Sequence, residues 1–154
     1  MTKRHTVRKA TIGDAPRVLE IRNHPTTRAA SLQTDEIPWE RHAPWFERTY
    51  LTEDAGHSCF VVETEGIVVG YCRYDTQDDG IMLVSIAVDP EFRGQGIGAS
   101  LLSESLATIT EKSRIIAEIL KRNDASLNLF IRNGFSIIDE DDVKYRLCYG
   151  SDPL

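Results

Sequence analysis

The sequence has few of the features that mark membrane, secreted and metal-binding proteins. Its apolar runs are only a few residues long, too short to span a bilayer. The opening residues, MTKRH, lead into no apolar segment, so no signal peptide is expected. The three cysteines, Cys59, Cys72 and Cys148, are an odd number without paired spacing, and the four histidines show no ligand spacing. We therefore expect a cytoplasmic protein with free thiols, no metal site and no membrane partner.

Positive charge is also in short supply. Lysine and arginine together number 18 against 24 acidic residues, which gives a net charge of −6 and a pI of about 5.2. Duplex nucleic-acid binders use lysine and arginine to neutralise phosphates, so this balance argues against a nucleic-acid partner. An acidic chain suits a cationic substrate such as an amine, although solubility alone would explain the charge.

No internal repeat, low-complexity tract or linker divides the 154 residues, and 41% of them are hydrophobic. This length and composition predict one globular domain over residues 1–154. Apolar residues at a spacing of two predict strands, and those at helical spacing predict helices. The expected strands cover residues 6–10, 58–63, 67–74, 81–88, 114–119, 135–139 and 143–148. The expected helices cover residues 11–23, a segment from about residue 38, residues 94–109 and residues 124–132.

This mixed order predicts an α/β or α+β sheet covered by helices. The strand Ile81–Val88 is almost wholly apolar, so we expect it to lie centrally with both faces buried. Thr11 and Asp14 have the spacing of a capping box at the first helix, and the His24-Pro25 step should end that helix. The polar stretch 26–36 is expected to hold no regular element.

Glycines alternate where the central strand leads into the third helix. The stretch Val88-Asp-Pro-Glu-Phe-Arg-Gly-Gln-Gly-Ile-Gly98 places Arg93 and three glycines at a helix start. Unpaired N–H groups and the helix dipole make such a start an anion site, and glycine lets a phosphate approach the backbone. The Gly-Lys-Ser/Thr of a P-loop is absent, and a dinucleotide-binding fingerprint fits only loosely and follows the wrong strand. A glycine-rich turn without a ligand is the simpler alternative.

Two motifs together resemble a known family. Arg93-x-x-Gly96-x-Gly98 after Ile86-Ala87-Val88 resembles the acyl-CoA pyrophosphate loop of the GNAT superfamily of N-acetyltransferases. The block from Asn123 to Phe135 resembles that superfamily's second motif, and the likeness in element order extends from Thr6 to Cys148. The resemblance implies a mixed, mostly antiparallel sheet of six to seven strands, with helices on both faces and a splayed strand pair that holds CoA.

The resemblance also implies a cofactor site and a reaction. Acetyl-CoA would be the co-substrate, and a small-molecule amine would attack its thioester directly in a ternary complex. Asn123 would contact the pantetheine arm, although it also suits the N-cap of the following helix. The implied acetyl-CoA-binding residues are Ile86, Ala87, Val88, Arg93, Gly94, Gln95, Gly96, Ile97, Gly98, Ala99, Asn123, Ser126 and Phe130.

The chain departs from the family where proton transfer is concerned. Phe130 stands where many members have a tyrosine that protonates the leaving thiolate, and the central strand lacks the glutamate that often serves as base. The candidates that remain for catalysis are Glu118, Asp75 and His42, with Ser126 as a relay. Each has a plain structural alternative, on the surface or in packing, so no base is assigned.

Several segments resemble acetyltransferases that act on amino groups of nucleotide-linked sugars. These segments are Arg22-Asn-x-Pro-x-x-Arg28, His42-x-x-Trp45-Phe46 and Gly70-Tyr-Cys-Arg73-x-Asp75. The resemblance makes Arg28, His42, Trp45, Arg73 and Asp75 candidates for the acceptor site, although Trp45 also suits simple packing. Protein N-termini, polyamines and antibiotics stay open as acceptors. A catalytically silent CoA-binding module and a homodimer are also open.

Overall fold

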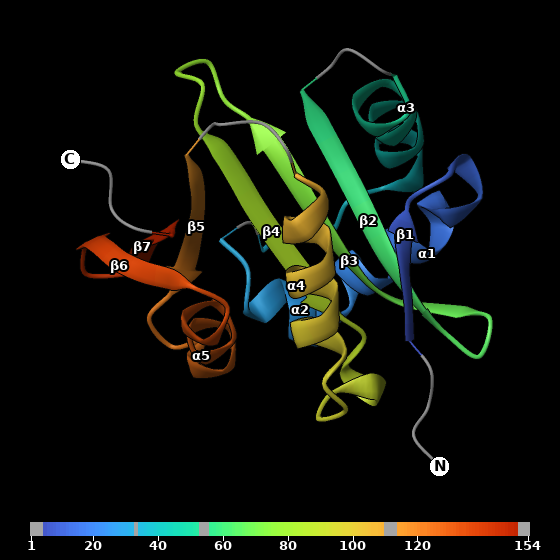
Figure 1. Cartoon of the computed structure of the whole chain (residues 1–154). Coiled ribbons are helices and arrows are strands. Elements are labelled where there is room, and N and C mark those ends of the chain that lie inside the picture. The colour runs from blue at the N-terminus through green and yellow to red at the C-terminus, as the bar shows by residue number, and fades with distance from the viewer. Residues whose placement is uncertain (1–4, 33, 53–55, 110–113, 151–154) are drawn as a thin grey trace.

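The computed structural model describes residues 5–32, 34–52, 56–109 and 114–150, and its centre is one mixed sheet (Figure 1). Seven strands lie in the order β1-β2-β3-β4-β5-β7-β6, and the pairs are antiparallel except β4 with β5. The prediction of a mostly antiparallel sheet of six to seven strands is therefore confirmed. The strands are β1 (His5–Lys9), β2 (His57–Thr64), β3 (Ile67–Thr76), β4 (Met82–Val88), β5 (Ile115–Leu120), β6 (Phe135–Glu140) and β7 (Lys144–Tyr149).

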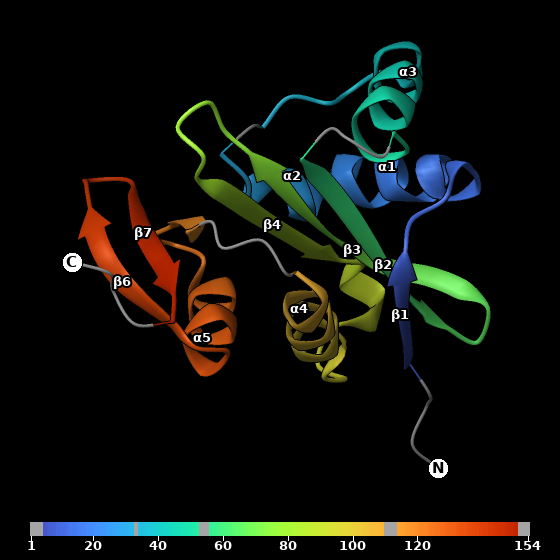
Figure 2. The ribbon, with the colours of Figure 1, turned by 45° about the horizontal axis from the view of Figure 1, so that its top comes forward.

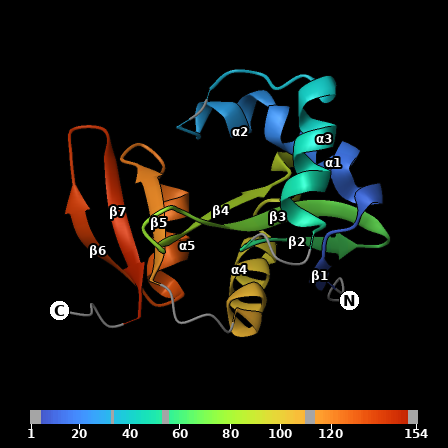
Figure 3. The same cartoon turned by 90° about the horizontal axis from the view of Figure 1, so that it is seen from above.

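Helices cover both faces of this sheet, as the sequence predicts. Figures 2 and 3 show α1, α2 and α3 on one face, and α4 and α5 on the other. No helix among the described residues is long and apolar enough to cross a membrane. The helices are α1 (Ala15–Asn23), α2 (Pro25–Ala29), α3 (Trp39–Tyr50), α4 (Ile97–Thr108) and α5 (Asp124–Arg132), with short 3₁₀ turns η1 (Ile12–Asp14) and η2 (Pro90–Phe92).

The start of the first helix follows its capping signal. The backbone N–H of Thr11 donates to the Asp14 carboxylate at 2.7 Å, and η1 leads directly into α1. That helix ends at Asn23, as the His24-Pro25 step predicts. The expectation of no regular element over 26–36 is wrong in part, because α2 begins at Pro25. Proline suits the first position of a helix, where its missing N–H costs no hydrogen bond.

Two hydrophobic cores lie on opposite faces of the sheet, because side chains along each strand alternate between the faces. The core under α4 and α5 includes Cys72, Tyr74 and Leu101. The Tyr74 hydroxyl and Ser105 Oγ are both buried and lie 2.7 Å apart, so their polar atoms are paired inside it. The core under α1 and α3 includes Tyr71 from the same strand. Residues 71, 73 and 75 therefore face α1 and α3.

The pairing of β4 with β5 is short. Its register comprises Met82 with Ile115 and Leu83 with Ile116. Beyond these pairs the two strands diverge (Figures 1 and 3), so the splayed pair implied by the family resemblance is present. β4 is central, but the prediction that both its faces are buried holds only in part. Residues 85–88 are half-buried because they border the space that this divergence opens.

Candidate active site

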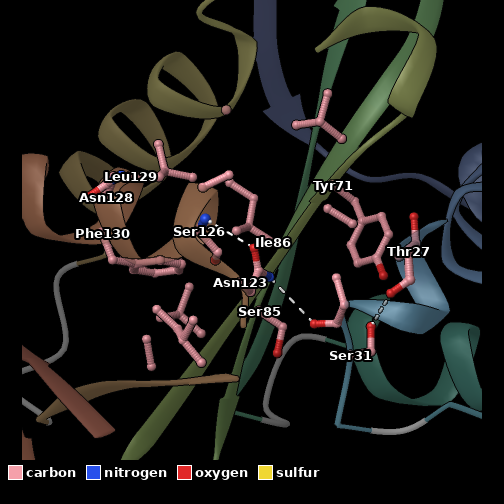
Figure 4. Close-up of a pocket in the computed structure, with 18 of the residues that line it drawn as sticks. Thr27, Ser31, Tyr71, Ser85, Ile86, Asn123, Ser126, Asn128, Leu129 and Phe130 are labelled. Atoms are coloured by element: carbon pink, nitrogen blue, oxygen red, sulfur yellow. Dashed lines mark hydrogen bonds between the residues drawn. The ribbon is translucent and has the colours of Figure 1, made fainter. Parts of the chain in front are cut away.

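A cavity of about 700 Å³ lies where β4 and β5 separate (Figure 4). Residues 85–88 of β4 and 117–120 of β5 line it, together with the start of α4, one side of α5 and the end of α2. The sequence-predicted cofactor residues line this one cavity, except Gln95, which is exposed and does not contribute. The two separate motifs are therefore brought together in space.

The glycine-rich loop ends in an open helix start. Gly94 and Gly96 have φ angles of +80° and +75°, in a region of backbone conformation that residues other than glycine rarely adopt. A Cβ built at either position meets nothing within 4 Å, so the backbone here is open to a ligand. No side chain caps α4, and the first intrahelical bond recorded at this end is from Ser100 N–H to the Gly96 carbonyl. The amides of residues 97–99 are thus available to an anion.

The residue that leads into this loop is fixed by its carboxylate. Asp89 Oδ1 accepts a hydrogen bond from Glu91 N–H at 3.0 Å, and its Oδ2 forms an ion pair with Arg17. Burial alone would raise the pKa of Asp89. The hydrogen bonds from Arg17 and Glu91 and the Arg17 charge outweigh burial, so the pKa lies below its usual range. A charged Asp89 therefore holds the strand end and the loop in place.

The wall that α5 contributes combines packing and capping. Asn123 Oδ1 accepts from Ser126 N–H at 3.2 Å, which is the N-cap of α5, and Asn123 Nδ2 approaches the Ala30 carbonyl at 3.5 Å (Figure 4). Phe130 lines the cavity but is only 2% exposed. Its hydrocarbon ring has no exchangeable proton, so the wall is apolar at the position where the family resemblance implies a tyrosine.

The face of the cavity under α1–α3 carries Arg73, which the sequence analysis proposed for the acceptor site, and three residues that it did not assign. Arg22 from α1, Tyr71 and Arg73 from β3, and Ser85 from β4 line it. Ser85 is the register partner of Arg73, so the two side chains lie on the same face. Arg22 and Tyr71 belong to the segments that resemble nucleotide-sugar acetyltransferases. No pattern of neighbouring residues, however, shows that α1 packs against β3 at this point.

Asp75 lies in a hydrogen-bonded cluster and does not line the cavity. It accepts from the Tyr50 hydroxyl at 2.8 Å and lies 3.0 Å from His57 Nδ1 and 3.6 Å from Arg73. The Arg73 guanidinium also lies over the Trp45 ring, 5.7 Å from its centroid. Asp75 and Trp45 therefore hold the Arg73 guanidinium on the side away from the cavity.

His42 is buried away from the cavity, with 1% of its surface exposed. Its Nε2 lies 3.0 Å from the Ala15 carbonyl, so this nitrogen carries the proton and donates. Burial lowers the pKa of His42, and the charges of Arg22 and Arg73 lower it further. A neutral His42 joins α3 to α1, which is a structural role.

Glu118 and Ser126 are the catalytic candidates that do line the cavity. Glu118 forms ion pairs with Lys144 at 2.8 Å and Arg146 at 3.3 Å. Of the candidate acceptor residues, Arg73 alone lines the cavity. Arg28 instead donates to the backbone carbonyls of Asn23 and Thr34, at 3.0 and 3.5 Å. Among the described residues, no three His, Cys, Asp or Glu side chains gather as metal ligands.

Two features are combined here: a sheet that opens between a parallel strand pair, and an uncapped, glycine-rich helix start beside the opening. Together they are typical of acyl-CoA-dependent N-acyltransferases. The profile described as the Acetyltransferase (GNAT) family matches residues 17–135. The chain belongs to this family. It is an acetyl-CoA-dependent N-acetyltransferase, as the resemblance in its sequence predicts.

Similar proteins have been named for several acceptors. The L-amino acid N-acyltransferase of Escherichia coli is 30% identical over 86% of this chain and 80% of its own length. The ribosomal protein bS18 alanine N-acetyltransferase of Escherichia coli is 25% identical over 70% of this chain and 79% of its own. The structure of an acetyltransferase from Salmonella typhimurium with its cofactor acetyl-CoA has a TM-score of 0.78 at 25% identity, covering 94% of this chain and 91% of that one. None of these three is named for a nucleotide-linked sugar.

Proposed function

We propose that the cavity between β4 and β5 holds acetyl-CoA and that a small-molecule primary amine enters from the α1–α3 face. Residues 1–154 would form one catalytic domain, since both cores pack on the same sheet. The observation that carries the proposal is that three features meet at one cavity. These are the uncapped start of α4, the unpaired edge of β4, and Arg22, Tyr71 and Arg73 on the α1–α3 face, which we call the acceptor face.

The strand edge fits an extended ligand. β4 is paired with β3 along its length, but its register with β5 ends at Leu83. Further along β4, the backbone groups that point toward β5 have no strand partner, and unpaired N–H and C=O groups are a template for an added chain. Ile86 and Val88 would bond the pantetheine arm, and the amides of residues 97–99, with Arg93, would bind its pyrophosphate.

Acetyl-CoA supplies a thioester whose acetyl group passes to the amine nitrogen while the sulfur leaves as a thiol. The protein's own contribution is to orient the two reactants, which is worth several powers of ten in rate. Leu129 and Phe130 give the cavity an apolar wall. Phe130 holds no proton, so the departing sulfur takes one from solvent.

Glu118 is our candidate for the group that accepts the amine proton. It is the one carboxylate among the residues that line the cavity. Its neighbours Ala117 and Ile119 point into the α4–α5 core, so Glu118 points to the opposite face, which is the face of Arg73 and Ser85. Glu118→Gln should lower kcat by about 100-fold, which is typical of losing a general base. An unchanged kcat would remove Glu118 from this role.

Our first candidate for the acceptor is an L-amino acid. The Escherichia coli enzyme named for that activity aligns with most of this chain. An amine on a nucleotide-linked sugar is a second candidate, favoured by Arg22 and Arg73, because arginine also binds phosphate. Both candidates are small molecules, and both carry an anionic group.

The test is release of free CoA thiol with a panel of amines: amino acids, nucleotide-linked amino sugars, polyamines and peptides that begin with alanine. Turnover with amino acids or sugar nucleotides supports the proposal. Turnover confined to peptides would overturn the small-molecule acceptor. Acetyl-CoA binding without transfer to any amine would overturn the catalytic assignment and leave a CoA-binding module.

A matched pair of glycine variants tests the cofactor end. Gly96→Glu places a side chain and a negative charge at the α4 start. Gly80→Glu adds the same group at a φ of +83°, also with nothing within 4 Å, in the β3–β4 turn. Both variants should lose about 1 kcal/mol of stability from the backbone strain. Calorimetry should show at least about a tenfold loss of acetyl-CoA affinity for Gly96→Glu alone. Equal affinities would overturn the site.

A further inference from the structure

The residues that line the cavity are cationic although the chain as a whole is acidic. The charged lining residues are Arg22, Arg73, Arg93, Arg132 and Glu118, in a chain whose net charge is −6. Glu118 is already paired with Lys144 and Arg146. Arg93 and Arg132 come from the α4 start and from α5, on the face opposite α1–α3. Arg22 and Arg73 are left on the acceptor face and need a separate explanation.

The two acceptor-face arginines are neighbours. Both line the same small second cavity beside His42, and both charges lower the pKa of that histidine. Arg22 and Arg73 also line the larger cavity together with Tyr71, which lies two residues before Arg73 on β3. Among the described residues, no carboxylate forms an ion pair with Arg22 within 4 Å, whereas Arg8 and Arg17 each form two. A half-buried guanidinium without a counterion favours an anionic ligand.

Arg73 is held in place from behind. Asp75 lies 3.6 Å from it, the Tyr50 hydroxyl lies 3.5 Å from its Nη1 and 2.8 Å from Asp75, and Trp45 packs against its face. Arg73 Nε is buried and has no hydrogen-bond partner in the part of the chain that the structure describes. Asp75 offsets part of the Arg73 charge, but one carboxylate shared with Tyr50 and His57 leaves donors of the guanidinium unused.

We propose that Arg22 and Arg73 form an anion subsite on the acceptor face, so that the accepted amine carries a carboxylate or phosphate group close to its amino group. Tyr50 and Asp75 are positioning residues that orient Arg73. This inference rests on the proposed function, because it takes the α1–α3 face as the entrance for the amine.

The experiment compares acceptors with and without an anionic group. L-Methionine is set against L-methioninamide, and a UDP-linked amino sugar against the same sugar without its nucleotide. The wild-type protein should prefer the charged member of at least one pair by tenfold or more in kcat/KM. The pair that shows the preference identifies carboxylate or phosphate as the source of the anion.

The variants are Arg22→Gln and Arg73→Gln, with Arg41→Gln as the control. Arg41 is exposed on α3 and lines neither cavity. Each of the first two should lower kcat/KM for the charged amine by about 10- to 100-fold, as expected for charge-assisted hydrogen bonds. The neutral amine and the KM for acetyl-CoA should change little. Arg73→Lys should recover part of the loss, and Arg41→Gln should behave as wild type.

Substitution of the positioning residues should change KM for the charged amine and leave kcat nearly unchanged. Tyr50→Phe and Asp75→Asn should raise KM for the charged amine severalfold, with little change in kcat or in the neutral amine. A merely structural role would lower activity toward both members of a pair equally. Such an equal loss, or a wild-type protein that uses both members equally well, would overturn the subsite.

Failure of the proposed function gives a different result. In that case acetyl-CoA binds but none of the four amines is acetylated. The same amines are then measured by calorimetry as ligands of the CoA-bound protein. Tighter binding of a charged member, lost in Arg73→Gln, still supports the subsite. Equal binding within each pair, or no binding, counts against it.

Discussion

The ring of Phe130 meets the ring of Phe135 edge-on, with centroids 4.9 Å apart and an interplanar angle of 90°. Phe130 comes from α5 and Phe135 begins β6, so this contact fixes the helix to the strand that follows it. One face of Phe130 belongs to the core and the other borders the cavity. The side chain therefore affects stability and ligand binding together.

Substitutions of Phe130 should separate these two effects. Phe130→Tyr should be tolerated, because the phenol adds one hydroxyl on the cavity side. Where thiolate departure limits turnover, kcat should rise, by up to about 100-fold, the lower end of general acid catalysis. The measurement is kcat and KM on one confirmed amine. Loss of activity with intact fold and acetyl-CoA affinity would show that the ring lies away from the thioester.

Phe130→Ala should cost about 3 kcal/mol or more of unfolding free energy, because it empties a ring-sized space in a buried site. Acetyl-CoA affinity should fall as well. Urea unfolding followed by circular dichroism measures the first effect and calorimetry the second. Full stability in this variant would contradict the burial of the ring.

Asn123 offers a test of capping against ligand binding. Asn123→Ser keeps an N-cap acceptor for Ser126 N–H, whereas Asn123→Ala removes it and should cost about 1 kcal/mol. Neither variant keeps the amide donor that lies at the cavity. We expect KM for acetyl-CoA to rise in both variants and the melting temperature to fall in the alanine variant alone. An unchanged KM in Asn123→Ser would restrict Asn123 to capping.

The three cysteines are buried and free, and they should be unreactive while the protein is folded. Burial raises the pKa of Cys72 to about 12, and burial raises the pKa of Cys59 as well, so neither thiol is a thiolate near neutral pH. Thiol titration should find little reaction in buffer and all three thiols in denaturant without reductant. Rapid reaction of the folded protein would contradict the burial, and a missing thiol in denaturant would indicate a disulfide.

The Asp14 carboxylate should make the free energy of unfolding fall at acidic pH. Burial would raise the pKa of Asp14, but hydrogen bonds from Arg8, at 2.7 and 3.0 Å, and from Thr11 N–H outweigh burial and lower it. A group with a lowered pKa stabilises the fold above its unfolded pKa of about 4, and the contribution is lost as pH falls through the folded value.

Asp14→Asn should therefore be about 1.5–3 kcal/mol less stable than wild type at pH 7, the range for hydrogen bonds to a charged group. The difference should shrink as pH falls from about 4 toward the lowered pKa of the folded state, because the unfolded wild-type chain takes up the proton first. Urea unfolding at pH 7 and pH 3 measures both values, with the exposed Asp35→Asn as control. A constant difference across this range would show that the charge of Asp14 is not responsible.

The parts of the fold that depend on neighbouring residues could be predicted from the sequence. The bounds of α5 match the prediction, because an Asn123 cap and an Asn133-Gly134 end are both local signals. The residues proposed to bind the cofactor could be selected from the sequence for the same reason, since each motif is continuous, and all but Gln95 line the cavity. α2 was missed because five residues are too few to show a period.

The acceptor face depends on contacts between distant residues. Arg22 reaches the cavity only because α1 packs on β3, and Asp75 is enclosed by Tyr50 and His57 from two other elements. The sequence shows that Tyr71, Arg73 and Asp75 share a face, but it does not show that the first two reach the cavity and the third does not.

The short pairing of β4 with β5 is a seam at which the sheet can separate locally. On one side of it lie β1–β4, and on the other β5–β7 with α5, joined across the sheet by the pairs at Met82 and Leu83. The Arg122 guanidinium adds a link to the Ala29 carbonyl at 2.8 Å. The β5 amides that point toward β4 can therefore exchange with solvent when this seam opens, whereas those that point toward β7 stay bonded to that strand. A ligand that fills the gap replaces the missing ladder, so it should slow hydrogen exchange on both sides of the seam at once.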